Sequence, residues 1–553
     1  SNGLAATINN SGIETFERLN SSVIPTKEGN VASLGDGLLT VRTPLDLQEG
    51  TKRLPWSIVL VCEDYNSDGE VNWQDAAAAH KTIRTEVKGM ETMKDNMMWI
   101  AMNFASQAQT TFPSSLDLGK TIYNYTDGFG QMIMHKGYAA EGHDDSHGDY
   151  AGHVNTRAGG AEAFNAAIEE GKDYNIQYGI HINVGEHMPD GLSFNEDVMF
   201  RPLSANWGWL DRAYWVDEQK DILSRNRYQN LVKLREELPA LSFIYVDIYS
   251  NSTWKADNLV SELNSLGFIV GTEFGGAMEQ GSAFTHWGRD NSYPNKGNTS
   301  EILRYFKNDL DVFTTDALFN SSMMPRVATW SNKNNINEAS EDFFNHNLPR
   351  KYMQHFDVLD IEDNYVVFSD GVRSEKTGSG NEGDSNIVTL TKNGRKLAEW
   401  TWWNLSPTVN TEASTNTGDA IVFIPWYDED STTQNPDDAD KIYHWNANGG
   451  TTTWQVPENW TDLAAADVYQ LSGDNKVKVA TVEIVNGEIT LNAEAKTGYV
   501  LYPAGSEAPR VAGDFGSGTP IENPNFDATD LSGWTVETTE AAEVSVAKNP
   551  TTW

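Results

Sequence analysis

The sequence predicts an α/β-plus-β protein: a (β/α)8 TIM-type barrel, then a β-sandwich, then the start of a further β-module. From residue 51 to about residue 360, short apolar strands alternate with longer segments of helical periodicity, which is typical of parallel sheets built from β-α units. After about residue 360 the helical periodicity largely disappears, and apolar strands alternate with Gly, Asn and Asp turns. We therefore expect residues 51–360 to form the barrel and residues 361–505 to form the sandwich.

The two ends of the chain carry weaker patterns. Residues 1–50 contain short alternating apolar patches, which we interpret as a lead-in β segment or the end of an N-terminal β-domain. Residues 506–553 begin in a Gly-, Ser- and Pro-rich stretch typical of a linker and continue as the truncated start of another β-module. The polar first residues lack a secretion signal, so we expect this sequence to be a piece of a longer protein.

The bulk composition narrows the class of partner. At 553 residues the chain exceeds what one hydrophobic core usually supports, so two or three domains are expected. The formal charge of −39, from 79 acidic and 40 basic residues, repels polyphosphates and anionic lipids and argues against a nucleic-acid partner. No stretch approaches the ~20 apolar residues of a membrane span. The 18 Trp and 20 Tyr can stack on sugar rings, although large β-rich proteins also carry many aromatic residues in their cores.

The clearest β-α units lie between residues 228 and 273. The first combines leucines at helical spacing, a proline stop and a short apolar strand: Leu231, Leu234, Leu238, Pro239 and 243–246. The second repeats this plan with a glycine stop: Leu259, Leu263, Leu266, Gly267 and 268–270. The two strands lead to Asp247 and Glu273, so each ends on a carboxylate.

Comparable strands are predicted at 57–62, 99–104 and 178–183 in the barrel, and at 420–426, 477–485 and 498–502 in the sandwich. The single cysteine, Cys62, excludes an internal disulfide. Because Cys62 ends the apolar run 57–62, we expect it to be a buried structural thiol.

Asp247 and Glu273 are the candidate catalytic residues. The carboxyl ends of barrel strands converge on one mouth, so both side chains should face a common pocket. If the carboxyl groups lie ~5 Å apart, one can attack an anomeric carbon while the other protonates the leaving oxygen, which gives glycoside hydrolysis with net retention. Two acids at strand ends can equally bind a divalent metal or form structural salt bridges.

Polar and aromatic side chains near other strand ends suit a sugar ligand. His181 and Asn183 end one strand, and the segment EGHDDSHGDY supplies Asp144 and His147. Interleaved histidines and aspartates can also hold zinc, but this spacing matches no hydrolytic zinc motif. Trp207 and Trp209 stand two residues apart, so an extended loop would project both from one side as an aromatic lid; ordinary packing against a helix is the alternative.

The segment DYNSDGEVNWQD, residues 64–75, follows the twelve-position calcium loop, with a glycine at the sixth position. The predicted ligands are Asp64, Asn66, Asp68, Glu70 through its carbonyl, Asn72 directly or through water, and Asp75. An aspartate replaces the usual terminal glutamate. A single copy next to a barrel strand favours a structural calcium ion over an empty acidic turn.

These motifs together resemble the bacterial endo-α-N-acetylgalactosaminidases, glycoside hydrolases that release Galβ1-3GalNAc from Ser or Thr of mucin-type glycoproteins. The resemblance spans roughly residues 55 to 505. It rests, in family order, on VNWQD, NFASQAQ, TDGFGQ, KGY with EGHDDSHGDY, HIN, WGW, FIYVD, the Glu273 strand, HWGRD, NKG and YMQHF.

The resemblance implies a role for each candidate residue. Asp247 would be the nucleophile and Glu273 the acid/base of a double displacement that retains the anomer. The family's sugar contacts would fall on Asp144, His147, His181, Asn183 and the mobile tryptophans Trp207 and Trp209. A family Trp-Gln pair would place Trp330 at the sugar, although Ser331 stands where the glutamine would be.

The resemblance further implies a secreted or cell-surface bacterial enzyme that acts on mucin-type O-glycoproteins and glycopeptides without an organic cofactor. Two alternatives stay open. One is a retaining barrel glycosidase for another α-linked GalNAc or Gal sugar. The other is a surface protein that binds mucin without catalysis, against which both carboxylates count.

Overall fold

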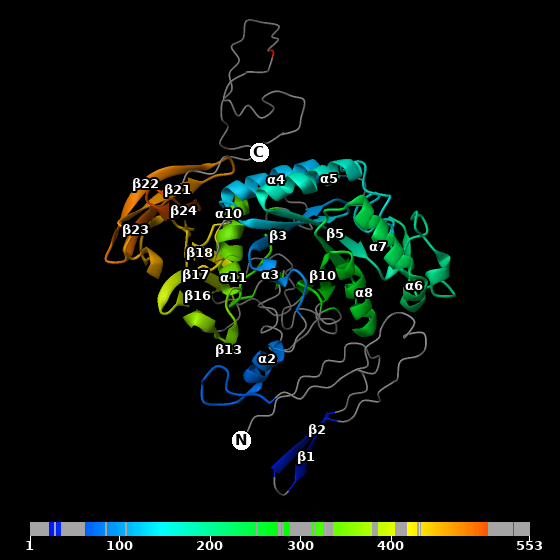
Figure 1. Ribbon diagram of the computed structural model, residues 1–553, viewed down its shortest axis with the longest axis horizontal. Coiled ribbons are helices and arrows are strands. Elements are labelled where there is room, and N and C mark those ends of the chain that lie inside the picture. Colours follow the sequence, from blue (N-terminus) through cyan, green and yellow to red (C-terminus); the bar gives the residue numbers. More distant parts are fainter. Residues whose placement is uncertain are drawn as a thin grey trace.

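The computed structural model describes residues 21–26, 29–34, 61–82, 86–104, 108–208, 210–249, 253–274, 278, 281–287, 311–312, 316–324, 327, 336–378, 385–403, 417–428, 431, 433–506 and 535. Near the N-terminus, β1 (Ser21–Thr26) and β2 (Gly29–Leu34) pair as an antiparallel hairpin. The remaining elements form a parallel sheet with helices, a small three-stranded sheet and, later in the chain, an antiparallel β-sandwich (Figure 1).

Seven parallel strands follow one another in space in the order of the chain. They are β3 (Asn96–Met102), β4 (Gly130–Lys136), β5 (Ile176–Asn183), β9 (Phe243–Asp247), β10 (Ile269–Phe274), β11 (Phe284–Trp287) and β12 (Asp311–Val312). A parallel bridge joins Met98 of β3 to Met323, so a further segment lies on the side of β3 that faces away from β4. The prediction of a parallel sheet built from β-α units is confirmed.

The helices of this part connect and flank the strands, except the first, which precedes them and is hydrogen-bonded through Gln74 to Ile361 (Figure 1). They are α2 (Trp73–Lys81), α3 (Met90–Met93), α4 (Phe112–Tyr125), α5 (Gly160–Gly171), α6 (Glu218–Ser224), α7 (Asn226–Glu237) and α8 (Thr253–Ser265). Helix α7 buries Leu231 and Leu234 and ends just before Pro239, as the leucine spacing predicts. After α8, Gly267 adopts φ +93°, a left-handed conformation that ends a helix readily at glycine. None of the helices in the described residues is both long and apolar enough to cross a membrane.

The parallel sheet has an apolar core on each face, because side chains alternate along a strand. The face that we call the inner face carries a core that contains Met98, Ile100, Met132, Met134, Phe243, Tyr245, Ile269, Phe284 and Met323. The other contains the alternate residues, such as Trp99, Ile133, Ile244 and Val270, together with apolar side chains of α4, α5, α7 and α8. Met323 belongs to the inner core, so the bridged segment packs with the strands.

The sandwich begins at β13 and its strands continue to β24. The strands are β13 (Val358–Glu362), β14 (Tyr365–Phe368), β15 (Val372–Thr377), β16 (Ser385–Lys392), β17 (Arg395–Trp403), β18 (Thr417–Trp426), β19 (Lys441–Asn446), β20 (Gly450–Gln455), β21 (Ala465–Leu471), β22 (Lys476–Val485), β23 (Glu488–Ala493) and β24 (Gly498–Pro503). Short helices α10 (Ala339–Asp342) and α11 (Leu348–Met353), with a π-helical turn between them, precede these strands.

The sandwich packs directly against the parallel-sheet part. One buried apolar cluster contains residues of both parts, among them Trp99 of β3 and Tyr502 of β24. Within the contact, the buried Asp127 carboxylate accepts hydrogen bonds from Lys441 and Lys476, at 3.0 and 2.9 Å, and from the Tyr502 hydroxyl. Burial alone would raise the pKa of Asp127, but the two lysines lower it to about 2, so the carboxylate is ionised across the contact.

Some sequence predictions fail or lie outside the described residues. Val61 is 86% exposed and Cys62 is only half-buried, and neither lies in a strand, so the buried thiol predicted at Cys62 is wrong and the predicted strand does not include these two residues. Residues 57–60 lie outside the described residues, as do most of the lead-in segment and of the C-terminal module.

Candidate active site

The candidate site continues the alternation of the inner face beyond the apolar core. Beyond Met132 and Met134, the next residue of β4 on that face is Lys136, and beyond Phe243 and Tyr245 on β9 it is Asp247. By the same alternation β5 places His181 and Asn183 there, and β10 places Glu273 there. At the carboxyl ends of these strands, charged and polar side chains therefore lie next to the apolar core of the inner face.

Asp247 and His181 form the centre of this group. The His181 Nε2 and Asp247 Oδ2 atoms lie 3.2 Å apart, and the His181 ring stacks on Tyr245. Burial alone would raise the pKa of Asp247, but His181 and Lys136 more than offset it and hold the pKa well below its ordinary value. Burial, aided by Lys136, lowers the pKa of His181, so the ring is neutral at pH 7. Asp247 is thus an ionised, poorly hydrated carboxylate, the state that a nucleophile requires.

Glu273 lies next to Asp247 across the β9–β10 pair. Thr272 pairs with Val246, so Glu273 and Asp247 occupy the following position on both strands. The backbone N–H of Ile248 donates to Glu273 Oε2 at 3.0 Å. Ile248 has φ +41°, a left-handed conformation that costs a non-glycine residue on the order of 1–3 kcal/mol. Such strain is maintained only where the surrounding contacts enforce it.

A second carboxylate group comes from the loop after β4. Asp144 Oδ1 lies 3.0 Å from His143 Nδ1 and 3.5 Å from His147 Nε2. Burial lowers the pKa of His143 to about 4. For Asp144, the two histidines outweigh burial and hold the pKa well below its ordinary value. The His143 ring also packs edge-on against His181, which places this loop beside the Asp247 pair.

Glu186 connects three separate segments around this loop. Its fully buried carboxylate lies 2.9 Å from His147 Nδ1, accepts from Asn183 Nδ2 at 2.8 Å, and accepts from Asn206 Nδ2. Asn206 precedes Trp207 in β7 (Ala205–Gly208), which pairs with β8 (Arg212–Trp215) and, through it, with β6 (Glu186–His187). Glu186 therefore anchors the tryptophan-bearing hairpin to the strand ends.

The charge on His147 gives a testable pH dependence. Burial alone lowers the pKa of His147, but Asp144 and Glu186 outweigh burial and raise the pKa to about 9, from about 6.5 in an unfolded chain. A raised folded-state pKa stabilises the fold fully below pH 6.5, and the contribution is lost as pH rises through 9. In urea denaturation we expect the parent's advantage over His147→Gln to shrink by about 3 kcal/mol between pH 6.5 and 9.5.

The buried His444 provides the control for this measurement. Burial lowers its pKa to about 4, so it stays neutral throughout that pH window. His444→Gln should therefore leave the slope of stability against pH unchanged. Parallel curves for the parent and His147→Gln would show that the Asp144–His147–Glu186 charges do not stabilise the fold.

The structure brings together six of the nine predicted catalytic and sugar-binding residues: Asp247, Glu273, Asp144, His147, His181 and Asn183. Trp207 is 51% exposed on its hairpin, consistent with a free aromatic face. Trp209 and Trp330 lie outside the described residues. Sequence reasoning missed Lys136 and Glu186. A lysine in register with Met132 and Met134 was a usable signal, whereas nothing local marks Glu186.

The predicted calcium loop folds as a turn held by its own carboxylates. Asp64 accepts from the N–H of Asp68 at 3.1 Å and of Gly69 at 2.9 Å, and Gly69 has φ +92°. Asp75 accepts from Tyr65 N–H at 2.7 Å and from Asn72 N–H at 2.8 Å. Asn72 and Asp75 also form the capping box of α2, which explains why the loop leads directly into a helix.

The donor set of this loop fits calcium, because it is made of carboxylate and amide oxygens around a glycine turn. The carboxylates are not gathered to metal-binding separations, however. In the described part of the chain, the acidic trio whose oxygens lie within 4.8 Å of one another is Asp145, Asp190 and Asp211, and it lies elsewhere.

Comparison with protein families gives two matches that follow each other along the chain. The family model described as Endo-alpha-N-acetylgalactosaminidase matches residues 74–340. The model described as Glycosyl hydrolase 101 beta sandwich domain matches residues 346–477. The first covers the parallel sheet with every candidate catalytic and sugar-binding residue, and the second covers most of the sandwich strands.

Comparison with individual proteins gives a relative whose name agrees with these matches, and more distant solved structures. A Renibacterium salmoninarum protein, provisionally named an endo-alpha-N-acetylgalactosaminidase, is 34% identical over 493 residues, which are 88% of this chain and 31% of that protein. Among solved structures, an alpha-N-acetylgalactosaminidase of Bifidobacterium bifidum in complex with GalNAc aligns at 14% identity with a TM-score of 0.40, covering 54% of this chain and 58% of the other. An Anoxybacillus alpha-amylase aligns at 11% identity with a TM-score of 0.38, covering 74% and 99%.

Proposed function

Because the chain belongs to the endo-α-N-acetylgalactosaminidase family of glycoside hydrolases, we propose that it cleaves the α-GalNAc–Ser/Thr linkage of core-1 O-glycans. The products are the disaccharide Galβ1-3GalNAc and the free hydroxyl of the peptide, and the anomeric configuration is retained. The chain spans about a third of the length of the Renibacterium relative, so the substrate and the outcome at the anomeric carbon are proposals for this part of the protein.

One observation carries the proposal: Glu273, near the end of β10, accepts a hydrogen bond from the amide that follows Asp247, the last residue of β9. Asp247 and Glu273 stand at matching positions of adjacent parallel strands, and the N–H that follows Asp247 binds Glu273 at 3.0 Å. The carboxyl groups therefore belong to one site. The retention that we propose requires carboxyl groups about 5 Å apart, so that one of them can attack directly, whereas an inverting enzyme needs room for a water between them.

The proposed reaction has two steps. Asp247 Oδ attacks C1 of GalNAc as Glu273 gives its proton to the glycosidic oxygen, so the C1–O bond to the peptide breaks and a glycosyl ester forms. Glu273, now ionised, takes a proton from water as the water oxygen attacks C1 and expels Asp247. His181 and Lys136 keep Asp247 ionised for the first step.

The remaining polar groups suit the hydroxyl and acetamido groups of the sugar. We assign Asp144, His147, His181 and Asn183 to sugar binding, since they are buried or half-buried and lie around Asp247. Trp207 and Trp209 would cover the sugar from their hairpin. Trp330 would line the same site, with Ser331 beside it in place of a glutamine.

We also propose that the seven-stranded sheet closes as a (β/α)8 barrel. Met323 pairs with β3 in parallel on the side opposite β4, which is where an eighth strand would lie. Met98 and Met323 share the inner core, as side chains inside a closed barrel do. The chain order of the strands agrees with such a closure.

The substrate class implies where the enzyme acts. Mucin-type O-glycoproteins and glycopeptides are the proposed partners, and they are met outside the bacterial cell. We therefore propose a secreted or surface-attached protein. The net charge of −39 keeps nucleic acid an improbable ligand.

We propose that residues 64–75 bind a structural calcium ion through Asp64, Asn66, Asp68, the Glu70 carbonyl, Asn72 and Asp75. Binding would draw the loop oxygens together and brace the start of α2. At a calcium concentration 100 times Kd, the folded state gains about 2.7 kcal/mol, so we expect the Tm to rise by a few degrees over the EGTA-treated protein.

Asp64→Asn with Asp68→Asn should abolish this rise, and calorimetry on the parent should show one calcium site that the double variant lacks. The matched control is Asp190→Asn, which removes a carboxylate from the other acidic trio and should retain the loop's response. If calcium raised the Tm of the double variant as much as that of the parent, calcium would bind outside residues 64–75.

The function is tested on a core-1 glycopeptide, with the products followed by NMR. The expected result is initial release of the α-anomer of Galβ1-3GalNAc. Release of the β-anomer would contradict retention, and faster turnover of single-GalNAc peptides would contradict core-1 preference. Binding without turnover would favour the mucin-binding alternative.

A further inference from the structure

The turn after β9 links the two proposed catalytic carboxylates. Ile248 supplies the N–H that binds Glu273, and it does so from a left-handed conformation that a β-branched residue rarely adopts. Asp247 immediately precedes this turn. Whatever enforces the Ile248 conformation therefore also sets how Asp247 and Glu273 face each other.

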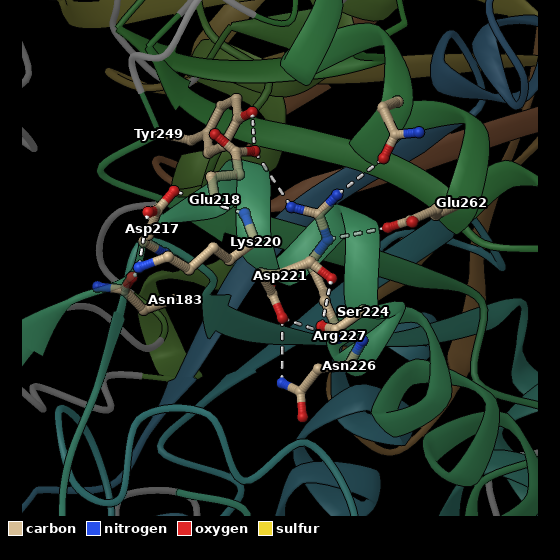
Figure 2. A network of polar contacts seen from close by, with 12 residues as sticks. Asn183, Asp217, Glu218, Lys220, Asp221, Ser224, Asn226, Arg227, Tyr249 and Glu262 are labelled. Carbon is tan, nitrogen blue, oxygen red and sulfur yellow. Dashed lines mark hydrogen bonds and ion pairs between the residues drawn. The ribbon is translucent and has the colours of Figure 1, made fainter. Parts of the chain in front are cut away.

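The side chain of the next residue, Tyr249, ties the turn to Glu218 through a buried hydrogen bond. Its side chain is buried, and its hydroxyl donates to Glu218 Oε1 at 2.5 Å. Burial and the Glu218 carboxylate hold the pKa of Tyr249 far above its ordinary value, so the hydroxyl remains a donor. The same Glu218 oxygen accepts from Arg227 Nη1 at 3.1 Å, so Tyr249 and Arg227 meet at Glu218 (Figure 2).

Arg227 extends this contact to the helices that precede the two catalytic strands. It lies on α7, which leads into β9, and it is 1% exposed. Its Nε donates to Glu262 Oε2 at 2.8 Å and its Nη2 to Asn258 Oδ1 at 3.1 Å, both on α8 (Figure 2). Helix α8 joins β9 to β10. A planar guanidinium with fixed donor directions thus bonds α7 to α8 and both to Glu218.

We propose that Tyr249 and Glu218 are positioning residues that hold the Ile248 turn against the Arg227 cluster and so fix the mutual orientation of Asp247 and Glu273. The proposal rests on the proposed function, because it assigns no chemical step of its own. The network contacts the turn through the hydroxyl of Tyr249. A displacement of about 1 Å in such a pair can cost roughly 100-fold in rate.

Tyr249→Phe removes one oxygen atom and tests the contact directly. We expect kcat on an aryl α-glycoside of Galβ1-3GalNAc to fall roughly 10- to 100-fold with KM changed by less than about threefold, because alignment is lost and binding is not. Glu218→Gln should produce a similar fall, since the amide holds Arg227 less well. In the double variant the losses should not multiply, as expected for two residues acting through one hydrogen bond.

A pH profile separates positioning from general loosening. An N–H donor favours the ionised form of the carboxyl group that it binds, so a displaced Ile248 amide leaves Glu273 protonated to higher pH. The alkaline limb of kcat/KM should therefore move upward in Tyr249→Phe. The control is Tyr443→Phe, which removes an equally buried hydroxyl that donates to the Thr126 carbonyl at 2.7 Å, away from the strand ends. It should leave kcat and the pH limb unchanged.

Three outcomes would overturn the proposal. Tyr249→Phe could fold and retain the parent's kcat and pH profile; its activity could fall only as far as that of Tyr443→Phe; or Tyr249→Phe and Glu218→Gln could both fail to fold while Tyr443→Phe folds, which would make the network a folding element. Asp247→Asn keeps the two proposals apart. An inactive Asp247→Asn beside an unimpaired Tyr249→Phe would refute only the positioning role, whereas a parent no more active than Asp247→Asn would refute the proposed function.

Discussion

Asp247→Ala is expected to lower kcat on an aryl α-glycoside of Galβ1-3GalNAc by roughly 10⁴-fold or more, the size of loss seen when a nucleophile is removed. The physical reason is that Asp247 is the carboxylate that we propose to form the glycosyl ester, while the neighbouring acids are held by other groups. Glu273 is held by the Ile248 amide, and Asp144 is paired with two histidines. Initial rates on the purified variant, with folding checked by circular dichroism, provide the measurement.

Azide provides a sharper version of the same experiment. The small anion can enter the space left by the Asp247 side chain and attack C1 directly, which would restore turnover and give the β-configured glycosyl azide. Asp360→Ala is the matched control, because it removes a strand carboxylate of β13 in the sandwich and should keep full activity. An α-configured azide, or no loss in Asp247→Ala, would show that Asp247 is not the nucleophile.

Glu273→Gln is expected to reduce kcat/KM on Ser- and Thr-linked glycopeptides by about 10³-fold, within the range that proton transfer by a positioned acid contributes. On aryl glycosides with good leaving groups, kcat/KM should fall less than about tenfold, since those leaving groups depart without a proton. The amide oxygen can still accept the Ile248 N–H, so the turn should keep its geometry. The difference between the two substrates therefore reports only how much each leaving group depends on protonation by Glu273.

Ionised Glu273 also has to activate water in the second step, so Glu273→Gln should accumulate the glycosyl-enzyme. A burst of aryl alcohol followed by a slow steady state is the expected time course, and azide should speed the slow phase. Glu236→Gln, which removes an exposed carboxylate of α7, is the control for a lost carboxylate and should show no burst. Equal losses of kcat/KM on glycopeptides and on aryl glycosides would show that Glu273 is not the general acid.

Local sequence pattern was sufficient for the elements that bear the catalytic pair. The leucine spacing with Pro239 and Gly267 predicts α7, α8 and the strands that follow them, and both predicted carboxylates lie on those strands. The calcium loop is also local, because twelve consecutive residues contain all the proposed ligands. The apolar pattern predicted the wrong environment for Val61 and Cys62, which are exposed and half-buried and do not lie in a strand.

Only the tertiary structure assigned Glu186, Lys136 and Arg227 to the site or to its support. His147 meets Glu186 and Tyr249 meets Glu218 across different β-α units, and no periodicity in the chain relates such positions. Which acid is paired, and which is ionised, depends on those distant partners and on burial. The sequence by itself determined which strands end on acids, because strand and helix signals act over a few residues. The charge state and orientation of those acids were decided by the tertiary fold, because electrostatic and hydrogen-bond partners are set by distance in space and not along the chain.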